Sequence, residues 1–207
     1  MKIVMFGDSI TDMGHRGDIG SVHSYGDGYP FVVFSKLSEQ YPMKYDIINN
    51  GISGNRTVDL YARIKKDVWN LQPDVLSILI GVNDIWHELS RQNGVEIKRF
   101  ERIYRMIIED TLEKLPFVKI MLLEPFFLRG TAVEELGYEG FTQVFDYAKV
   151  VKKIAEEYQL TFIPLQDKFN EMAKQYGAEY YLYDGVHPSV AGATLIANEW
   201  LKAFKEL

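Results

Sequence analysis

Five short apolar segments, each followed by a segment with helical periodicity, constrain the fold of this chain more than any other feature. They lie at residues 3–6, 45–48, 75–80, 119–124 and 161–165. The first of them lacks the polar alternation of a strand with one solvent-facing side, so we expect it to be buried on both faces. Strands that alternate with helices predict a parallel sheet between two helical layers. We therefore expect an α/β fold, a three-layer α/β/α sandwich whose five-stranded parallel sheet has the flavodoxin-like order 2-1-3-4-5.

The segments between these strands repeat their apolar residues about every 3.6 positions, as amphipathic helices do. Thr57 is expected to cap the second of them. Residues 11–28 are polar and glycine-rich and show neither period, so they are predicted to form a long surface loop. The expected helices cover residues 30–41, 60–71, 97–115, 141–158, 169–173 and 196–204.

Length and composition limit the classes of protein to which the chain can belong. A chain of 207 residues is expected to form a single domain, residues 1–207, around one core. Its 29 acidic and 23 basic residues give a net charge of −6, which disfavours nucleic acid as a partner. No segment approaches the roughly 18 apolar residues of a membrane span, and the first apolar segment is too short for a signal peptide. These features predict no membrane partner and a cytoplasmic location.

Polar residues follow the first three predicted strands at the point where each strand ends. Because the carboxyl ends of parallel strands lie at one edge of a sheet, these residues are expected to meet in one crevice. Ser9 alone is ambiguous, since a serine after a strand is either a nucleophile or the cap of the next helix. The three groups are Ser9, residues 51–55 and Asn83.

His187 is the best-placed base for such a serine. A serine hydroxyl is a poor nucleophile until a neighbouring base accepts its proton, and histidine suits that task. Of the four histidines, only His187 combines a carboxylate three residues earlier, Asp184, with a proline directly after it. Gly185 permits the tight turn that would bring Asp184 to one ring nitrogen. The alternative is a capped turn in a surface loop.

Attack on an acyl carbon also needs hydrogen-bond donors for the negative charge that develops on oxygen. Gly54 can offer a backbone N–H without a side chain in the way, and Asn83 can offer its amide. Each residue alone is typical of an ordinary turn. Their convergence on one crevice favours an oxyanion hole.

Four motifs together resemble the SGNH hydrolases, also called the GDSL family of lipases and esterases. They are Gly-Asp-Ser-Ile at 7–10, Gly-Ile-Ser-Gly-Asn at 51–55, Gly-Val-Asn-Asp at 81–84 and Asp-Gly-Val-His at 184–187. Isoleucine replaces the leucine of the family name, at a position without a chemical role. The motifs occur in the family's order and span nearly the whole chain.

The resemblance implies a carboxylic ester hydrolase with Ser9 as nucleophile, His187 as general base and Asp184 as the carboxylate that orients it. The oxyanion hole would comprise the N–H groups of Ser9 and Gly54 and the amide of Asn83. The reaction would be a two-step acyl transfer that needs neither a cofactor nor a metal ion. The other histidines are expected in loops, as solvated or substrate-rim residues: His15, His23 and His87.

The substrate is expected to be a small-molecule or oligosaccharide ester. Residues 49–55, residues 81–86 and the Asp-x-Val-His-Pro-Ser ending resemble the acetylxylan-esterase branch of the family. A long-chain lipase would more naturally carry an apolar lid, whereas the long loop here is polar. Short acyl groups, above all acetyl on a carbohydrate, are therefore favoured. Candidate residues of the substrate rim are Asp8, Asn55, Trp86, Phe126 and Tyr183, although aromatic residues there fit core packing equally well.

Two other functions remain open at this point. A lysophospholipase or thioesterase would use the same triad with a different pocket, and its activity would rise with acyl chains longer than about eight carbons. A non-catalytic carbohydrate-binding protein could keep the same fold. The high aromatic fraction, 14%, also leaves room for a homo-oligomer.

Overall fold

The computed structural model describes residues 1–207 and contains one sheet of five strands, all parallel. Their order is β2-β1-β3-β4-β5, which confirms the predicted topology. The strands are β1 (Lys2–Gly7), β2 (Asp46–Gly51), β3 (Val75–Leu79), β4 (Lys119–Leu123) and β5 (Thr161–Ile163).

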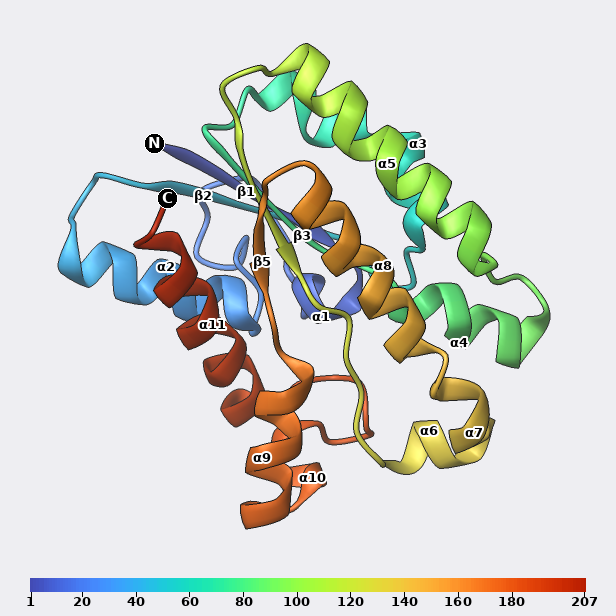
Figure 1. Ribbon diagram of the computed structural model, residues 1–207. Helices are drawn as coiled ribbons and strands as arrows, with labels where there is room; N and C mark the ends of the chain where they lie inside the picture. Colours follow the sequence, from blue (N-terminus) through green and yellow to red (C-terminus); the bar gives the residue numbers. More distant parts are fainter.

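Helices cover both faces of this sheet (Figure 1). On one face α2 (Tyr29–Gln40) packs against α11 (Val190–Phe204). On the other face α5 packs against both of its neighbours, α3 and α8. The bounds of these three helices are Thr57–Asp67 for α3, Ile97–Lys114 for α5 and Val144–Glu157 for α8. The arrangement confirms the three-layer α/β/α sandwich, and none of its helices has the length and apolar content needed to cross a membrane.

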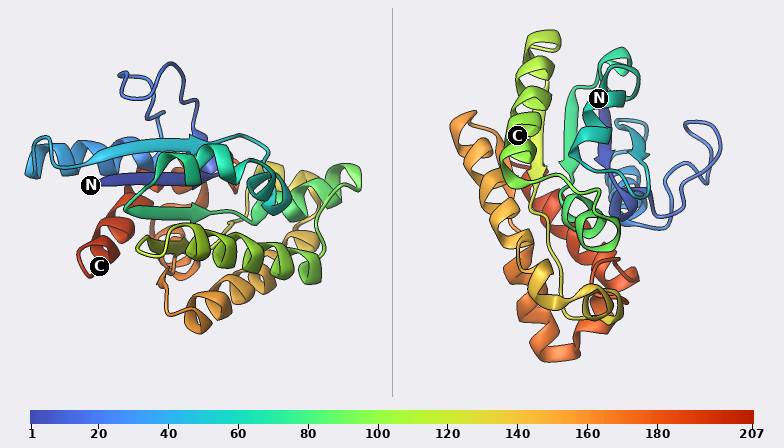
Figure 2. Two further views of the ribbon diagram at one scale, coloured as in Figure 1. Left: turned by 90° about the horizontal axis from the view of Figure 1, so that it is seen from above. Right: turned by 90° about the vertical axis from the view of Figure 1, so that its right-hand side faces the viewer.

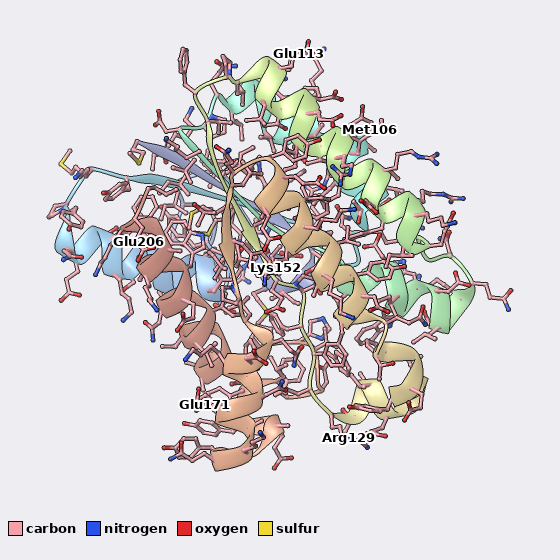
Figure 3. All side chains as sticks on the ribbon, viewed as in Figure 1. Met106, Glu113, Arg129, Lys152, Glu171 and Glu206 are labelled. Atoms are coloured by element: carbon pink, nitrogen blue, oxygen red, sulfur yellow. The ribbon has the colours of Figure 1, made fainter.

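The core lies where the strand pattern predicted it. Ile3, Val4, Met5 and Phe6 of the central strand β1 are all 0% exposed, as expected for a strand covered on both faces. The indole N–H of Trp200 in α11 donates to the Ser77 hydroxyl of β3 across 2.8 Å, so the one polar side chain within β3 has a partner. Charged residues such as Glu113, Lys152 and Glu171 lie on the outer faces of their helices (Figure 3).

Several short helices were not predicted, because each is brief or begins with polar residues. The most important is α4 (Val82–Arg91), whose first turn contains Asn83 and Asp84. The helix expected from residue 141 begins at Val144, since Phe141 ends a separate short helix. The remaining elements are α1 (Ser9–Asp12), η1 (Trp69–Leu71), α6 (Thr131–Leu136), α7 (Tyr138–Phe141), α9 (Gln166–Tyr176), which was expected, and α10 (Ala178–Tyr181).

Strand β2 extends three residues beyond the predicted strand, through Asn49, Asn50 and Gly51. The buried Asn49 amide donates to the backbone carbonyls of Thr11 and Tyr25, both across 2.8 Å, so it ties β2 to the segment after β1. A Cβ on Gly51 would lie 2.2 Å from the Asp12 nitrogen. Asn49 and Gly51 therefore serve close packing of β2 against α1, whereas the Asn50 amide donates to the Asp67 carbonyl of α3.

The predicted loop begins later than expected, because residues 9–12 form α1. The rest of it projects from the molecule as the blue loop in both views of Figure 2.

Thr57, predicted as a cap, is instead the first residue of α3, and Arg56 occupies the cap position. The Asp59 carboxylate accepts the Arg56 N–H across 2.8 Å and thereby satisfies that end of the helix.

Candidate active site

Ser9 begins α1 immediately after the carboxyl end of β1. The cap of this helix is Asp8, whose carboxylate accepts the Ile10 N–H across 2.9 Å. The Ser9 hydroxyl is therefore not needed as a cap, so one of the two roles that the sequence left open is filled by another residue. As the first residue of α1, Ser9 also has an N–H without a carbonyl partner in that helix.

The Ser9 hydroxyl lies 2.9 Å from Nε2 of His187. The other ring nitrogen of His187, Nδ1, lies 2.7 Å from Oδ2 of Asp184. The second carboxylate oxygen of Asp184 accepts the N–H groups of Val186 and His187 across 2.9 and 2.8 Å. The turn places Gly185 at φ 98°, a left-handed conformation that favours glycine. Serine, imidazole and carboxylate thus form one continuous hydrogen-bonded chain.

The surroundings of these three side chains favour a charged His187 imidazole beside an ionised Asp184 carboxylate. Burial opposes the charge of His187, but the hydrogen bond and charge of Asp184 outweigh it and raise the pKa of His187 above its usual value. Burial likewise opposes ionisation of Asp184, yet hydrogen bonds from His187 and Val186 hold the pKa of Asp184 below its usual value. Asp184 is therefore ionised at neutral pH and can stabilise an imidazolium ion.

Gly54 and Asn83 come from the segments after β2 and β3, as predicted. Gly54 has φ 81°, and its N–H donates no hydrogen bond within the protein. Asn83 lies in the first turn of α4, where its Nδ2 donates to the Asn55 carbonyl across 3.1 Å. An amide nitrogen carries two hydrogens, so this bond orients the group and leaves one N–H to donate elsewhere.

Asp84 is a buried residue of this site to which the sequence pattern gave no role. Its carboxylate accepts the backbone N–H of Thr57 across 3.1 Å and the Thr57 hydroxyl across 2.9 Å. It therefore joins the beginnings of α3 and α4. Burial raises the pKa of Asp84 to about 8. The sequence signal for Asp84 was its position directly after Asn83, together with a threonine, Thr57, at the expected start of another helix.

The predicted rim residues divide into two groups. The rings of Trp86 and Tyr183 flank His187 at 5.9 and 5.8 Å between centroids, and Tyr183 is 55% exposed. Phe126, in contrast, is 0% exposed and stacks on Phe169, so it belongs to the core rather than to the rim.

Asp8 is also buried, because its side chain caps α1 beneath the site rather than facing the crevice. Asn55 is half-buried and holds Asn83 through its carbonyl. His87, expected in a loop, lies in α4, with Nε2 3.9 Å from where a Cβ on Gly54 would stand. The structure contains no cluster of three or more histidine or carboxylate side chains that could bind a metal ion.

Comparison with known proteins identifies the family. The model of the GDSL-like lipase/acylhydrolase family matches residues 5–195, which is most of the chain and includes every residue of the site. The chain belongs to this family. It is therefore a member of a family of carboxylic ester hydrolases, as its motifs predicted.

Relatives of this GDSL-family protein resemble it over nearly their full length. An acetylxylan esterase of Geobacillus stearothermophilus is 36% identical over 210 residues, covering 97% of this chain and 92% of the relative. The crystal structure of Axe2, an acetylxylan esterase of that organism, has a TM-score of 0.86 at 35% identity and covers 98% and 93% of the two chains. A GDSL-like protein of Parabacteroides merdae has a TM-score of 0.90 at 38% identity, covering 99% and 95%.

Proposed function

We propose that this protein is a serine esterase that removes short acyl groups, above all acetyl, from carbohydrate esters. The observation that carries the proposal is the hydrogen-bonded chain from the Ser9 hydroxyl through His187 to Asp184. Such a chain supplies the activated nucleophile, the base and the orienting carboxylate that acyl transfer requires.

In the first step, Nε2 of His187 accepts the Ser9 proton as Oγ attacks the acyl carbon. The carbonyl electrons move onto oxygen, where the N–H groups of Ser9 and Gly54 and the Asn83 amide donate to the resulting anion. Asp184 stabilises the imidazolium ion through Nδ1. When the tetrahedral intermediate collapses, the alcohol leaves with the proton from His187, and the acyl group remains on Ser9.

The second step repeats this chemistry with water. His187 removes a proton from the water molecule that attacks the acyl carbon, and the same three donors stabilise the oxyanion. Collapse breaks the bond to Ser9 Oγ, which recovers its proton from His187. The carboxylic acid is released, and the site returns to its starting state.

Two observations support acetyl carbohydrate as the substrate class. The relative with 36% identity is an acetylxylan esterase, and a mutant of Axe2 is described as an acetyl-xylooligosaccharide esterase. In this chain, the aromatic rings of Trp86 and Tyr183 both lie against His187. Flat aromatic faces of this kind suit stacking against sugar rings.

The rate of ester hydrolysis is expected to rise with pH and then reach a plateau. Only neutral His187 can accept the Ser9 proton, and Asp184 raises the pKa of His187. The inflection in kcat/KM should thus lie above the usual histidine value of about 6.5. Protonated His187 is stabilised by Asp184, and this contribution to folding stability is fully present below the usual histidine pKa of about 6.5. It is lost as pH rises through the folded-state pKa of His187. Activity therefore rises over the same pH range in which this contribution to stability falls. Rates measured from pH 5 to 9 test this, and a flat profile contradicts it.

Acetate release from acetylated xylo-oligosaccharides tests the substrate class. Wild-type protein is expected to deacetylate these sugars and a synthetic acetyl ester, and to lose activity as the acyl chain of the synthetic ester lengthens. Cleavage of the synthetic acetyl ester without any acetylated sugar would remove the carbohydrate assignment. Activity that rises beyond about eight carbons would favour a lysophospholipase or thioesterase, whose pocket must bury more apolar surface.

A further inference from the structure

Arg63 is a largely buried cation close to the site, and none of the steps above uses it. It lies in the middle of α3, and only 15% of its side chain is exposed. Its guanidinium group stacks on the ring of Phe6 in β1, with 4.3 Å from Cζ to the ring centroid. Burying a guanidinium group costs free energy unless its hydrogen bonds are satisfied, so its partners indicate what it does.

Two of those partners belong to two of the three segments that supply the oxyanion donors. Nη2 of Arg63 donates to the Gly7 carbonyl across 3.0 Å, two residues before Ser9. Nε donates to Oδ1 of Asn55 across 2.7 Å. The Asn55 carbonyl in turn accepts from the Asn83 amide across 3.1 Å. One guanidinium group therefore contacts both the segment that carries Ser9 and the segment that follows Gly54.

The third partner, Asp67, holds the guanidinium group itself. Nη1 of Arg63 lies 2.9 Å from Oδ2 of Asp67, one helical turn further along α3. The planar guanidinium group has N–H bonds in fixed directions, so fixing one edge on Asp67 fixes the directions of the other two bonds. Lysine, with one ammonium group on a flexible stem, could not reach three such acceptors in this geometry.

We propose that Arg63 is a positioning residue that sets the spacing between the oxyanion donors of Ser9, Gly54 and Asn83. The inference rests on the proposed esterase function. Oxyanion donors act only when they lie close to the position that the charged oxygen will occupy. Losing the link between residues 7 and 55 leaves the bond from the Ile52 N–H to the Gly7 carbonyl but frees residues 54 and 55 to shift. Such a shift weakens binding of the transition state more than binding of the ester.

The kinetic test compares Arg63→Lys and Arg63→Met with wild type on a synthetic acetyl ester. Arg63→Met keeps an apolar stem above Phe6, while Arg63→Lys keeps the charge. Both are expected to lower kcat on the order of 10²-fold, as a displacement of about 1 Å does, with little change in KM. The control is Arg105→Met, because Arg105 is also a helical arginine with two carboxylate partners, Glu101 and Glu157, but lies on α5 away from the site.

A second measurement reports the position of the donors without using activity. In ¹H–¹⁵N spectra, the side-chain amide of Asn83 and the backbone amide of Gly54 are expected to shift in both Arg63 variants and to stay in place in Arg105→Met. Asn55→Ala removes the same link from its other side. The double variant with Arg63→Met should therefore lose less activity than the product of the two single losses.

The results separate this inference from the proposed function. If wild type hydrolyses no ester, the proposed function fails, and the amide spectra still decide the role of Arg63. If both Arg63 variants fold, keep the wild-type kcat and leave the two amides unshifted, the inference is wrong. A fall in kcat that only matches the unfolded fraction measured by circular dichroism would also overturn it.

Discussion

Ser9→Ala is expected to lower kcat for acetyl ester hydrolysis by about 10⁴- to 10⁶-fold, the range found when single members of such a triad are removed. The substitution deletes the only hydroxyl within hydrogen-bond distance of His187 Nε2, so no acyl-enzyme can form. KM and the unfolding temperature should change little, because the oxyanion donors and the core remain. Initial rates of acetate release from purified wild-type and variant protein provide the measurement.

Ser35→Ala is the matched control for this substitution. Ser35 is an exposed serine in α2, so its loss should leave kcat within about twofold of wild type, as for surface substitutions generally. A Ser9→Ala protein that is folded yet keeps one-tenth of the wild-type rate would show that another group attacks the ester.

Asp184→Asn is expected to lower kcat by about 10⁴-fold, because an amide in place of the carboxylate favours the wrong tautomer of the imidazole. The amide oxygen can still accept the N–H groups of Val186 and His187, so the turn should keep its shape. The amide cannot stabilise an imidazolium ion. Rates for the purified variant test this expectation, and Asp167→Asn, at an exposed carboxylate in the first turn of α9, serves as the control.

The same substitution should also move the pH profile of the residual activity. Asp184 is what raises the pKa of His187, while burial lowers it. Without the carboxylate, only the charge of Asp8 still opposes burial, so the inflection should shift to lower pH. An unchanged inflection, or a loss of less than tenfold in kcat, would mean that Asp184 does not act through His187.

The sheet order was predictable because buried strands and amphipathic helices leave periodic patterns that hardly depend on distant contacts. Residues 3–6 are apolar without alternation, and they form the central strand. The convergence of Ser9 and Asn83 followed from the same reasoning, since parallel strands end at one edge. His187 could be chosen among four histidines because it alone combines a carboxylate three residues earlier with a proline directly after it, and that carboxylate contacts its ring.

Other features depend on contacts that no local pattern reveals. Asn49 reads as a turn residue, yet its side chain is satisfied by the carbonyls of Thr11 and Tyr25, which lie far away in sequence. Phe126 follows a strand near the active edge, but stacking on Phe169 of α9 takes it into the core. The helical conformation of Asn83 was hidden because Gly81, Asn83 and Asp84 are residue types typical of a turn. Asp84 of α4 accepts a hydrogen bond from the Thr57 hydroxyl at the start of α3, a contact between two helices that the sequence does not reveal.

The central claim is that Ser9 is an activated nucleophile, and covalent labelling tests it most directly. Wild-type protein would be treated with a phosphonofluoridate, which reacts with activated serines, and then analysed by intact-mass and peptide mass spectrometry. We predict a single adduct on Ser9 that is absent in Ser9→Ala, forms much more slowly in His187→Ala and abolishes acetate release. An adduct on another residue, or full labelling of Ser9 without loss of activity, would contradict the claim.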